Sequence, residues 1–147
     1  MPIRPENAKR YPPDWKLRSR FVRQYRAKNR CEWCGVRQYG VGYWDAVGRF
    51  WYAGGSLFYD DFQYTESYRL ARDACDSINE NRLGDEPRHI VIVLTTAHVH
   101  DDRPEASDLL NLAALCQRCH NAHDMKDRAQ GRRERREAAS GQVRMFA

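Results

Sequence analysis

Apolar and polar positions along this 147-residue chain switch between helical and strand-like spacing, which predicts an α+β fold. Residues 14–29 have the spacing of a basic helix that Asp14 can cap. Its expected buried stripe consists of Trp15, Phe21, Val22 and Tyr25. Residues 88–100 (RHIVIVLTTAHVH) form the most strand-like segment, because they are rich in β-branched and apolar side chains. A final helix is predicted over residues 117–136.

The middle of the chain predicts a hairpin followed by a helix. Residues 39–59 are rich in aromatic side chains and glycine, and turns are expected near Gly48 and Gly54-Gly55. A small sheet packed on the core is favoured here over a surface that stacks on nucleic-acid bases. Residues 60–82 have amphipathic spacing, and Cys75 lies on the apolar side as a plain buried cysteine.

Composition excludes several classes of protein. The chain is 41% hydrophobic and 31% charged, which is typical of a soluble globular protein, and its length suits a single domain over residues 1–147. No apolar run approaches the roughly 20 residues that a membrane helix needs. The first residues (MPIRPENAKRYPPDWK) lack the apolar core of a signal peptide, so a cytoplasmic location is expected. The end of the chain, about 138–147, is expected to fray.

Four of the five cysteines occur in two identical pairs, Cys31-Glu-Trp-Cys34 and Cys116-Gln-Arg-Cys119. Two Cys-x-x-Cys pairs in a reducing compartment predict one tetrahedral four-cysteine zinc site. Gly35 suits the tight turn of the first pair, where a positive φ is convenient. The alternatives are two unrelated buried pairs, a redox dithiol, or attachment of a c-type haem at Cys116-x-x-Cys119-His120. The haem reading leaves the first pair unexplained, so no haem is expected.

Charge is concentrated at the two ends of the chain. Residues 1–30 hold ten Lys and Arg against two acidic residues, a balance of +8. The balance is −5 over residues 38–87 and +3 over residues 120–147. Basic ends around an acidic middle indicate a nucleic-acid backbone as partner, against the plainer alternative of a solvated charged surface. The arginines expected to contact DNA are Arg132, Arg133, Arg135 and Arg136.

The order of these motifs resembles the HNH endonuclease family, in its phage-type form. The resemblance is carried by "CEWC", by a strand ending in His98, and by "NLAALCQRCH" with Asn111 and His120. It covers residues 14–37 and 88–128 and leaves 38–87 as an insertion. The family implies a ββα-metal (His-Me finger) core, in which two strands and a helix hold one catalytic ion beside a structural zinc.

The resemblance also implies roles for single residues. His98 would be the general base that takes a proton from water, since imidazole titrates near neutral pH. His120 would bind a divalent ion (Mg²⁺, Mn²⁺, Ni²⁺ or Zn²⁺) that acts as a Lewis acid on the scissile phosphate. Asn111 would order the loop and hold His98 through a side-chain hydrogen bond.

One position departs from the family pattern. The family usually has Asp or His directly before the base, as a second metal ligand, whereas this chain has Ala97. Asp124 is the preferred substitute, because it lies four residues after His120 on one helix face; His123 follows, as does His100, which alternation would place on the strand face of the base. Two functions stay open: a metal-dependent DNA endonuclease, or a non-catalytic zinc-containing protein that binds DNA or assembles with other proteins.

Overall fold

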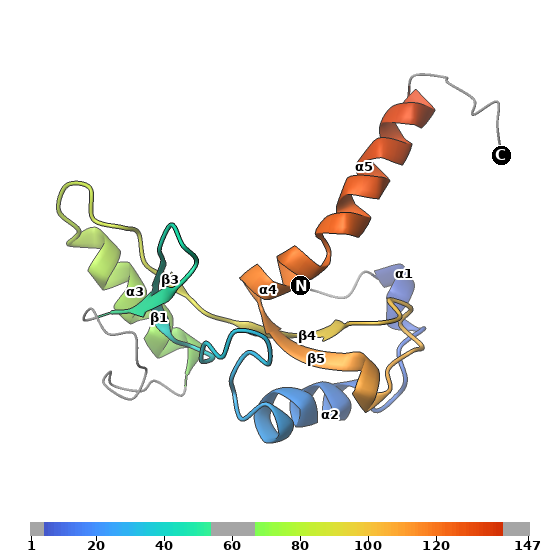
Figure 1. Ribbon diagram of the computed structural model, residues 1–147. Helices are drawn as coiled ribbons and strands as arrows, with labels where there is room; N and C mark the ends of the chain where they lie inside the picture. Colours follow the sequence, from blue (N-terminus) through green and yellow to red (C-terminus); the bar gives the residue numbers. More distant parts are fainter. Residues whose placement is uncertain (1–4, 54–66, 140–147) are drawn as a thin grey trace.

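The computed structural model describes residues 5–53 and 67–139 of the chain, and its fold is α+β with two small sheets (Figure 1). The elements in order are α1 (Pro5–Ala8), α2 (Trp15–Arg20), η1 (Phe21–Arg26), β1 (Val41–Trp44), β2 (Phe50–Tyr52), α3 (Tyr68–Glu80), β3 (Ile90–Val91), β4 (Leu94–His98), η3 (Leu109–Asn111), β5 (Leu112–Cys116), α4 (Gln117–His123) and α5 (Met125–Ala139). In the part of the chain that the structure describes, no helix combines the length and the apolar content of a membrane span.

The antiparallel pair β4–β5 is covered on both faces. Alternate residues point to opposite sides of a strand, so the pairs Ala97↔Ala113 and His98↔Leu112 belong to different faces. On one face, Leu112 and Ala114 pack with Val22 of η1. On the other face, the core holds Ala97, Ala113 and Leu115, and the same cluster of buried residues includes Cys31 and Cys116 at the end of β5. Every residue of β5 is buried because side chains pack against both faces of this strand.

The second sheet has the order β2-β1-β3 and packs against α3. The expected hairpin turn is present, with Gly48 at a φ of +86°. Its small core contains Cys75 and Ala71 of α3, packed against Val41 and Val91 of the sheet. Cys75 is therefore a buried cysteine, as predicted. The expected turn at Gly54-Gly55 and the start of the predicted helix, residues 60–66, lie outside the described residues.

The single strand predicted over residues 88–100 is wrong. The segment forms two short strands, β3 and β4, that belong to different sheets. Between them, Ile92 is buried and exchanges backbone hydrogen bonds with residues before β1: Tyr39 N donates to Ile92 O and Ile92 N donates to Gly40 O, both at 2.8 Å. The run is continuously apolar because β3 is buried in one sheet and β4 in the other. A pattern of this kind looks the same as that of one long buried strand.

The basic N-terminal helix also differs from its prediction. After α2 the chain makes a π-helical turn, η1, in which Ala27 N donates to Val22 O at 2.9 Å. Of the expected buried stripe, Val22 is fully buried, whereas Phe21 and Tyr25 are 43% and 70% exposed. Asp14 does not cap the helix; its carboxylate accepts a hydrogen bond from Arg18 Nε at 2.8 Å.

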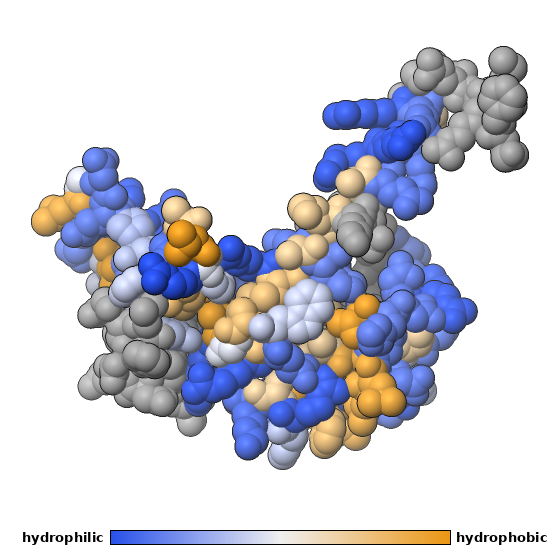
Figure 2. Space-filling model, in the orientation of Figure 1, coloured by the Kyte–Doolittle hydropathy of each residue, from blue (hydrophilic) through white to orange (hydrophobic). Residues whose placement is uncertain are grey.

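The predicted final helix is two helices, because the chain bends at Asp124 between α4 and α5. α5 projects from the rest of the molecule, and the described side chains on its surface are largely hydrophilic (Figures 1 and 2). A helix without an apolar face has no core to pack on, which explains why it extends into solvent. The predicted fraying of the tail falls mostly on residues 140–147, outside the described residues.

Candidate functional site

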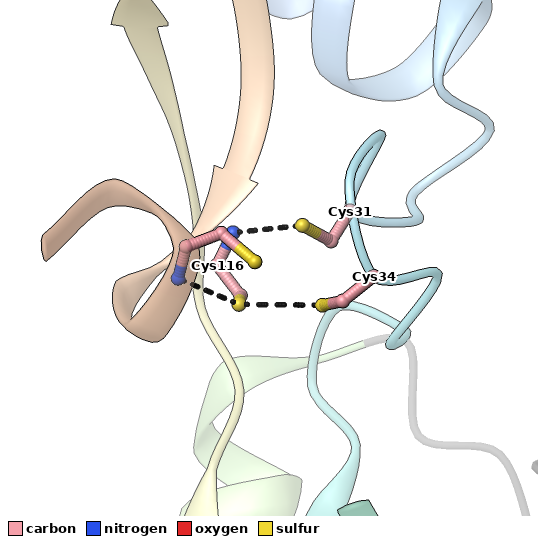
Figure 3. A group of neighbouring side chains, drawn as sticks. Cys31, Cys34 and Cys116 are labelled. Carbon is pink, nitrogen blue, oxygen red and sulfur yellow. Dashed lines mark hydrogen bonds between the residues drawn. The ribbon is translucent and has the colours of Figure 1, made fainter. Parts of the chain in front are cut away.

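The four paired cysteines come together as one group. Their sulfur atoms all lie within 4.8 Å of one another, and Cys34 Sγ and Cys116 Sγ are 3.6 Å apart. Figure 3 shows Cys31 and Cys34 facing Cys116 across the gap between the first cysteine turn and the end of β5. A ZnS₄ tetrahedron with bonds of about 2.3 Å has sulfurs about 3.8 Å apart, so the spacing fits zinc. In the described part of the chain, this is the only group of three or more potential metal ligands at such distances.

The local backbone explains how each pair presents its thiols. In the first turn, Cys31 N donates to Val36 O and Gly35 N donates to Cys31 O, both at 2.8 Å. Gly35 has the predicted positive φ, +76°, which a residue with a side chain adopts only with strain. In the second pair, Cys116 is the N-cap of α4, and its sulfur accepts a hydrogen bond from Cys119 N at 3.5 Å.

Glu32 docks the first cysteine turn onto β5. Its backbone N–H donates to Ala114 O at 2.9 Å, and its carboxylate accepts from Ala114 N at 2.6 Å. The same carboxylate accepts two hydrogen bonds from Arg26, whose guanidinium also donates to Leu109 O and Leu112 O. The two cysteine pairs are thus brought together by protein contacts as well as by any shared metal.

Contacts and burial within the group shift the pKa of three of its thiols. Hydrogen bonds from the Cys116 and Cys34 thiols hold the pKa of Cys31 well below its usual range, and contacts with Cys116 and Cys31 raise the pKa of Cys34. Burial raises the pKa of Cys119 to about 12. A dication stabilises several thiolates together, and an all-sulfur donor set suits zinc.

His98 lies at the end of β4, on the face covered by α2. Its ring stacks on Trp15, with centroids 5.5 Å apart and planes 7° from parallel. Its Nε2 lies 3.3 Å from Ser107 Oγ. Burial lowers the pKa of His98 below its usual value; Asp101 and Asp102 oppose this effect and His120 adds to it. The ring is therefore neutral over a wider range of pH than an exposed histidine.

Asn111 orders the loop between β4 and β5, as expected. Its side-chain oxygen accepts from the backbone N–H groups of His100 and Asp101, and its amide donates to Asp101 O and Ala106 O. The expected hydrogen bond from Asn111 to the ring of His98 is replaced by the contact with Ser107. An amide has two donors and two acceptor sites, and the loop backbone uses all four.

His120 lies on α4, which adjoins the opposite face of β4. Its Nδ1 lies 2.8 Å from Thr95 Oγ1, and its Nε2 lies 3.5 Å from Asp124 Oδ2. The predicted proximity of His120 and Asp124 on one side of the helix is therefore present. Asp124 also contacts His123, whose Nδ1 lies 3.1 Å from Asp124 Oδ1.

The other residues considered as ligands occupy different places. β4 ends at His98, so strand alternation does not extend to His100, which borders an open cavity of about 820 Å³ with Asp14, Arg18 and Asn111. The chain bends after His98, so the expected alternation along one strand does not reach His100. Ala97 is 2% exposed and lies on the face of Thr95, toward α4. Ligands at Ala97 would thus point to the same side as His120.

The arginines expected to contact DNA are all exposed on α5: Arg132, Arg133, Arg135 and Arg136.

Three residues that contribute to the site had no signal in the sequence. Ser107 lies in a polar loop without a motif, Thr95 is one of two adjacent threonines, and Glu32 is hidden among the residues between two cysteines. Each acts through a contact with a residue at least nine positions away.

No protein-family model matches the chain, and neither a curated protein nor a solved structure matches it.

Proposed function

We propose that this protein is a metal-dependent endonuclease of the HNH type, which hydrolyses phosphodiester bonds in DNA. One observation carries the proposal: β4, β5 and α4 follow one another as an antiparallel hairpin and a helix, with His98 at the end of the first strand, Asn111 directly before the second, and His120 on the helix. This order of elements supports the ββα-metal core that the resemblance implies. The group of four cysteines supports it, because it fastens the start of α4 to the segment before β1.

The proposed reaction uses His98 as general base. The neutral ring takes one proton from a water molecule, and the water oxygen forms a bond to phosphorus while the bond from phosphorus to the 3′ oxygen breaks. The 3′ oxygen takes a proton from solvent, and His98 later releases its proton to solvent. The lowered pKa of His98 supports this role, since the base is unprotonated at neutral pH.

His120 and Asp124 are the proposed ligands of the catalytic ion. Their side chains lie within 3.5 Å of each other and offer one nitrogen and one carboxylate. A divalent ion held there would neutralise negative charge on the phosphate. The Thr95 contact orients the ring of His120 by engaging Nδ1, which leaves Nε2 on the side of Asp124.

DNA is the proposed partner, and the projecting helix α5 is its proposed contact surface. The helix has no apolar face that would pack on a core, and its exposed arginines carry the positive charge that binds phosphates without sequence preference. The N-terminal segment contributes further positive charge from α2 and η1.

A plasmid-nicking assay tests the proposal. The full-length protein is expected to convert supercoiled plasmid to open circles with Mg²⁺, Mn²⁺, Ni²⁺ or Zn²⁺ and to stop when EDTA is added. His98→Ala should reduce nicking by about 10² or more, the usual contribution of a general base, while zinc content and DNA binding stay unchanged. Equal nicking by His98→Ala and the parent protein would exclude the proposed role of His98.

A non-catalytic role in binding DNA or in assembly is the second candidate, and the residue at position 97 favours it. Ala97 has no ligand atom, and in the described part of the chain no group of three ligands other than the cysteines is close enough to hold an ion. If this candidate holds, DNA binding is retained and no metal supports nicking.

A further inference from the structure

The ring of His98 is held from two directions. Trp15 stacks against its face, and Tyr11 packs beside both rings, with centroids 6.0 Å from His98 and 4.7 Å from Trp15. At the edge of the ring, Nε2 meets Ser107 Oγ at 3.3 Å. Stacking restricts the plane of the ring, and the contact at Nε2 selects its orientation within that plane.

The hydroxyl of Ser107 has a second partner that determines the direction of this hydrogen bond. Its oxygen lies 2.6 Å from Pro104 O, and a carbonyl oxygen can only accept. The one hydroxyl hydrogen of Ser107 is therefore donated to Pro104. Toward His98, Ser107 Oγ can only accept, so Nε2 has to carry a hydrogen. Ser107 is 1% exposed, which shields both hydrogen bonds from competition by solvent.

We infer that Ser107 fixes neutral His98 in the tautomer with hydrogen on Nε2, which makes Nδ1 the nitrogen that accepts a proton. Ser107 is a positioning residue that acts through His98, and its catalytic relevance rests on the function proposed above. The Nε2–H bond to Ser107 is present in both the neutral and the protonated ring. A proton can thus arrive at Nδ1 and leave from it without any rotation of the ring.

The loop that carries Ser107 is itself fixed. Asn111 donates to Ala106 O at 2.6 Å, one residue before Ser107, and Arg18 Nη1 donates to Ser107 O at 2.8 Å. The contribution of Asn111 to the site is therefore indirect: it holds the loop that presents the acceptor for His98. Asn111 thus acts on His98 through the backbone of Ala106 and Ser107, and the hydrogen bond at Nε2 completes the connection.

Nitrogen-15 NMR of the full-length protein tests the tautomer without any assay of activity. At alkaline pH, where the imidazole is neutral, the ring of His98 is expected to show a pyrrole-type Nε2 and a pyridine-type Nδ1. Ser107→Ala removes the acceptor and should give a mixture of the two tautomers, whereas Ser107→Thr keeps the hydroxyl and should restore the parent pattern. A pyrrole-type Nδ1 in the parent protein would overturn the inference, whether or not the variants fold.

Nicking assays then test the consequence. Ser107→Ala is expected to lower kcat by about 10- to 100-fold, part of what a general base supplies, with KM unchanged, and Ser107→Thr should recover it. A parent protein that shows the Nε2–H tautomer but no nicking would overturn the proposed nuclease and leave the tautomer assignment intact. Unchanged kcat in a folded Ser107→Ala protein would overturn the positioning role.

Discussion

Cys34 Sγ and Cys116 Sγ lie 3.6 Å apart although 82 positions separate them in the sequence. The contact joins the turn before β1 to the N-terminus of α4, at the end of β5. Closing so long a loop costs conformational entropy that a shared metal ion would offset. The stability of this part of the fold should therefore depend on the metal.

Cys34→Ser should remove the metal and loosen the fold. We expect about one zinc per chain in the parent protein and almost none in the variant, with a loss of stability on the order of several kcal/mol, because structural zinc can contribute on the order of 10 kcal/mol. Elemental analysis and thermal melts measure both effects. Cys75→Ser is the matched control: it removes a buried thiol outside the group and should keep the zinc. Equal zinc in parent and Cys34→Ser would refute the site.

Glu32→Ala should destabilise the protein even when zinc is bound. The change leaves Ala114 N and the Arg26 guanidinium without their carboxylate partner, at a cost of roughly 1–3 kcal/mol. Urea denaturation in the presence of zinc measures the difference. Glu137→Ala is the control, since its ion pair with the 74%-exposed Arg133 should contribute less than about 1 kcal/mol. Similar losses for the two variants would argue against the docking role of Glu32.

Ala97→Asp tests whether a carboxylate at position 97, on the face of β4 toward α4, can bind a divalent ion together with His120. Ala97 is buried, so an added carboxylate should destabilise the metal-free protein by several kcal/mol. A divalent ion shared with His120 should recover part of the melting temperature and increase nicking. Ala114→Asp places the same charge on the opposite, equally buried face and should gain nothing from the ion. Identical behaviour of the two variants would show that the added carboxylate does not reach an ion held by His120.

Replacing Arg132, Arg133, Arg135 and Arg136 with Ala should weaken DNA binding and flatten its salt dependence. Each phosphate contact contributes about 0.9 to the slope of log affinity against log salt, so the slope should fall by up to about 4. Fluorescence anisotropy at several salt concentrations measures this. The matched control replaces four exposed arginines in and beside α3 with Ala: Arg69, Arg72, Arg82 and Arg88. Equal effects of the two sets would assign binding to net charge alone.

Asp45 should make the β1–β2 hairpin sensitive to acid. A hydrogen bond from Trp51 Nε1 at 2.9 Å, with further donors from Arg49, holds the pKa of Asp45 well below its usual range. A lowered pKa in the folded state contributes stability above the unfolded value of about 3.9, and this is lost as pH falls through the folded pKa. Asp45→Asn should therefore destabilise at neutral pH and make little difference in strong acid, as melts across pH would show. A pH-independent difference would contradict this.

The sequence predicted the parts of the molecule whose signals are local. The cysteine spacing, the positive φ of Gly35, the turn at Gly48 and the i, i+4 contact of His120 with Asp124 depend on a few neighbouring residues, and the structure agrees with each. The sequence did not indicate that residues 88–100 divide into two strands of different sheets. Ile92, which lies between these strands, is as apolar as its neighbours on either side. The π-helical turn and the contact of Ser107 with His98 could not be predicted either, since both depend on residues that meet only after folding.

The backbone contact between Gly40 and Ile92 has a consequence for how this chain can vary. The chain enters the lobe of β1, β2, β3 and α3 beside the point where it leaves it, so a segment of different length can replace residues 41–91 without moving what lies on either side. All four ligand cysteines lie outside this interval. Phe50 and Tyr52 lie inside this interval and pack in the same hydrophobic core as residues of β4 and β5. A replacement segment must therefore supply apolar side chains at this place. We therefore expect homologous chains to differ most in length and sequence within residues 41–91.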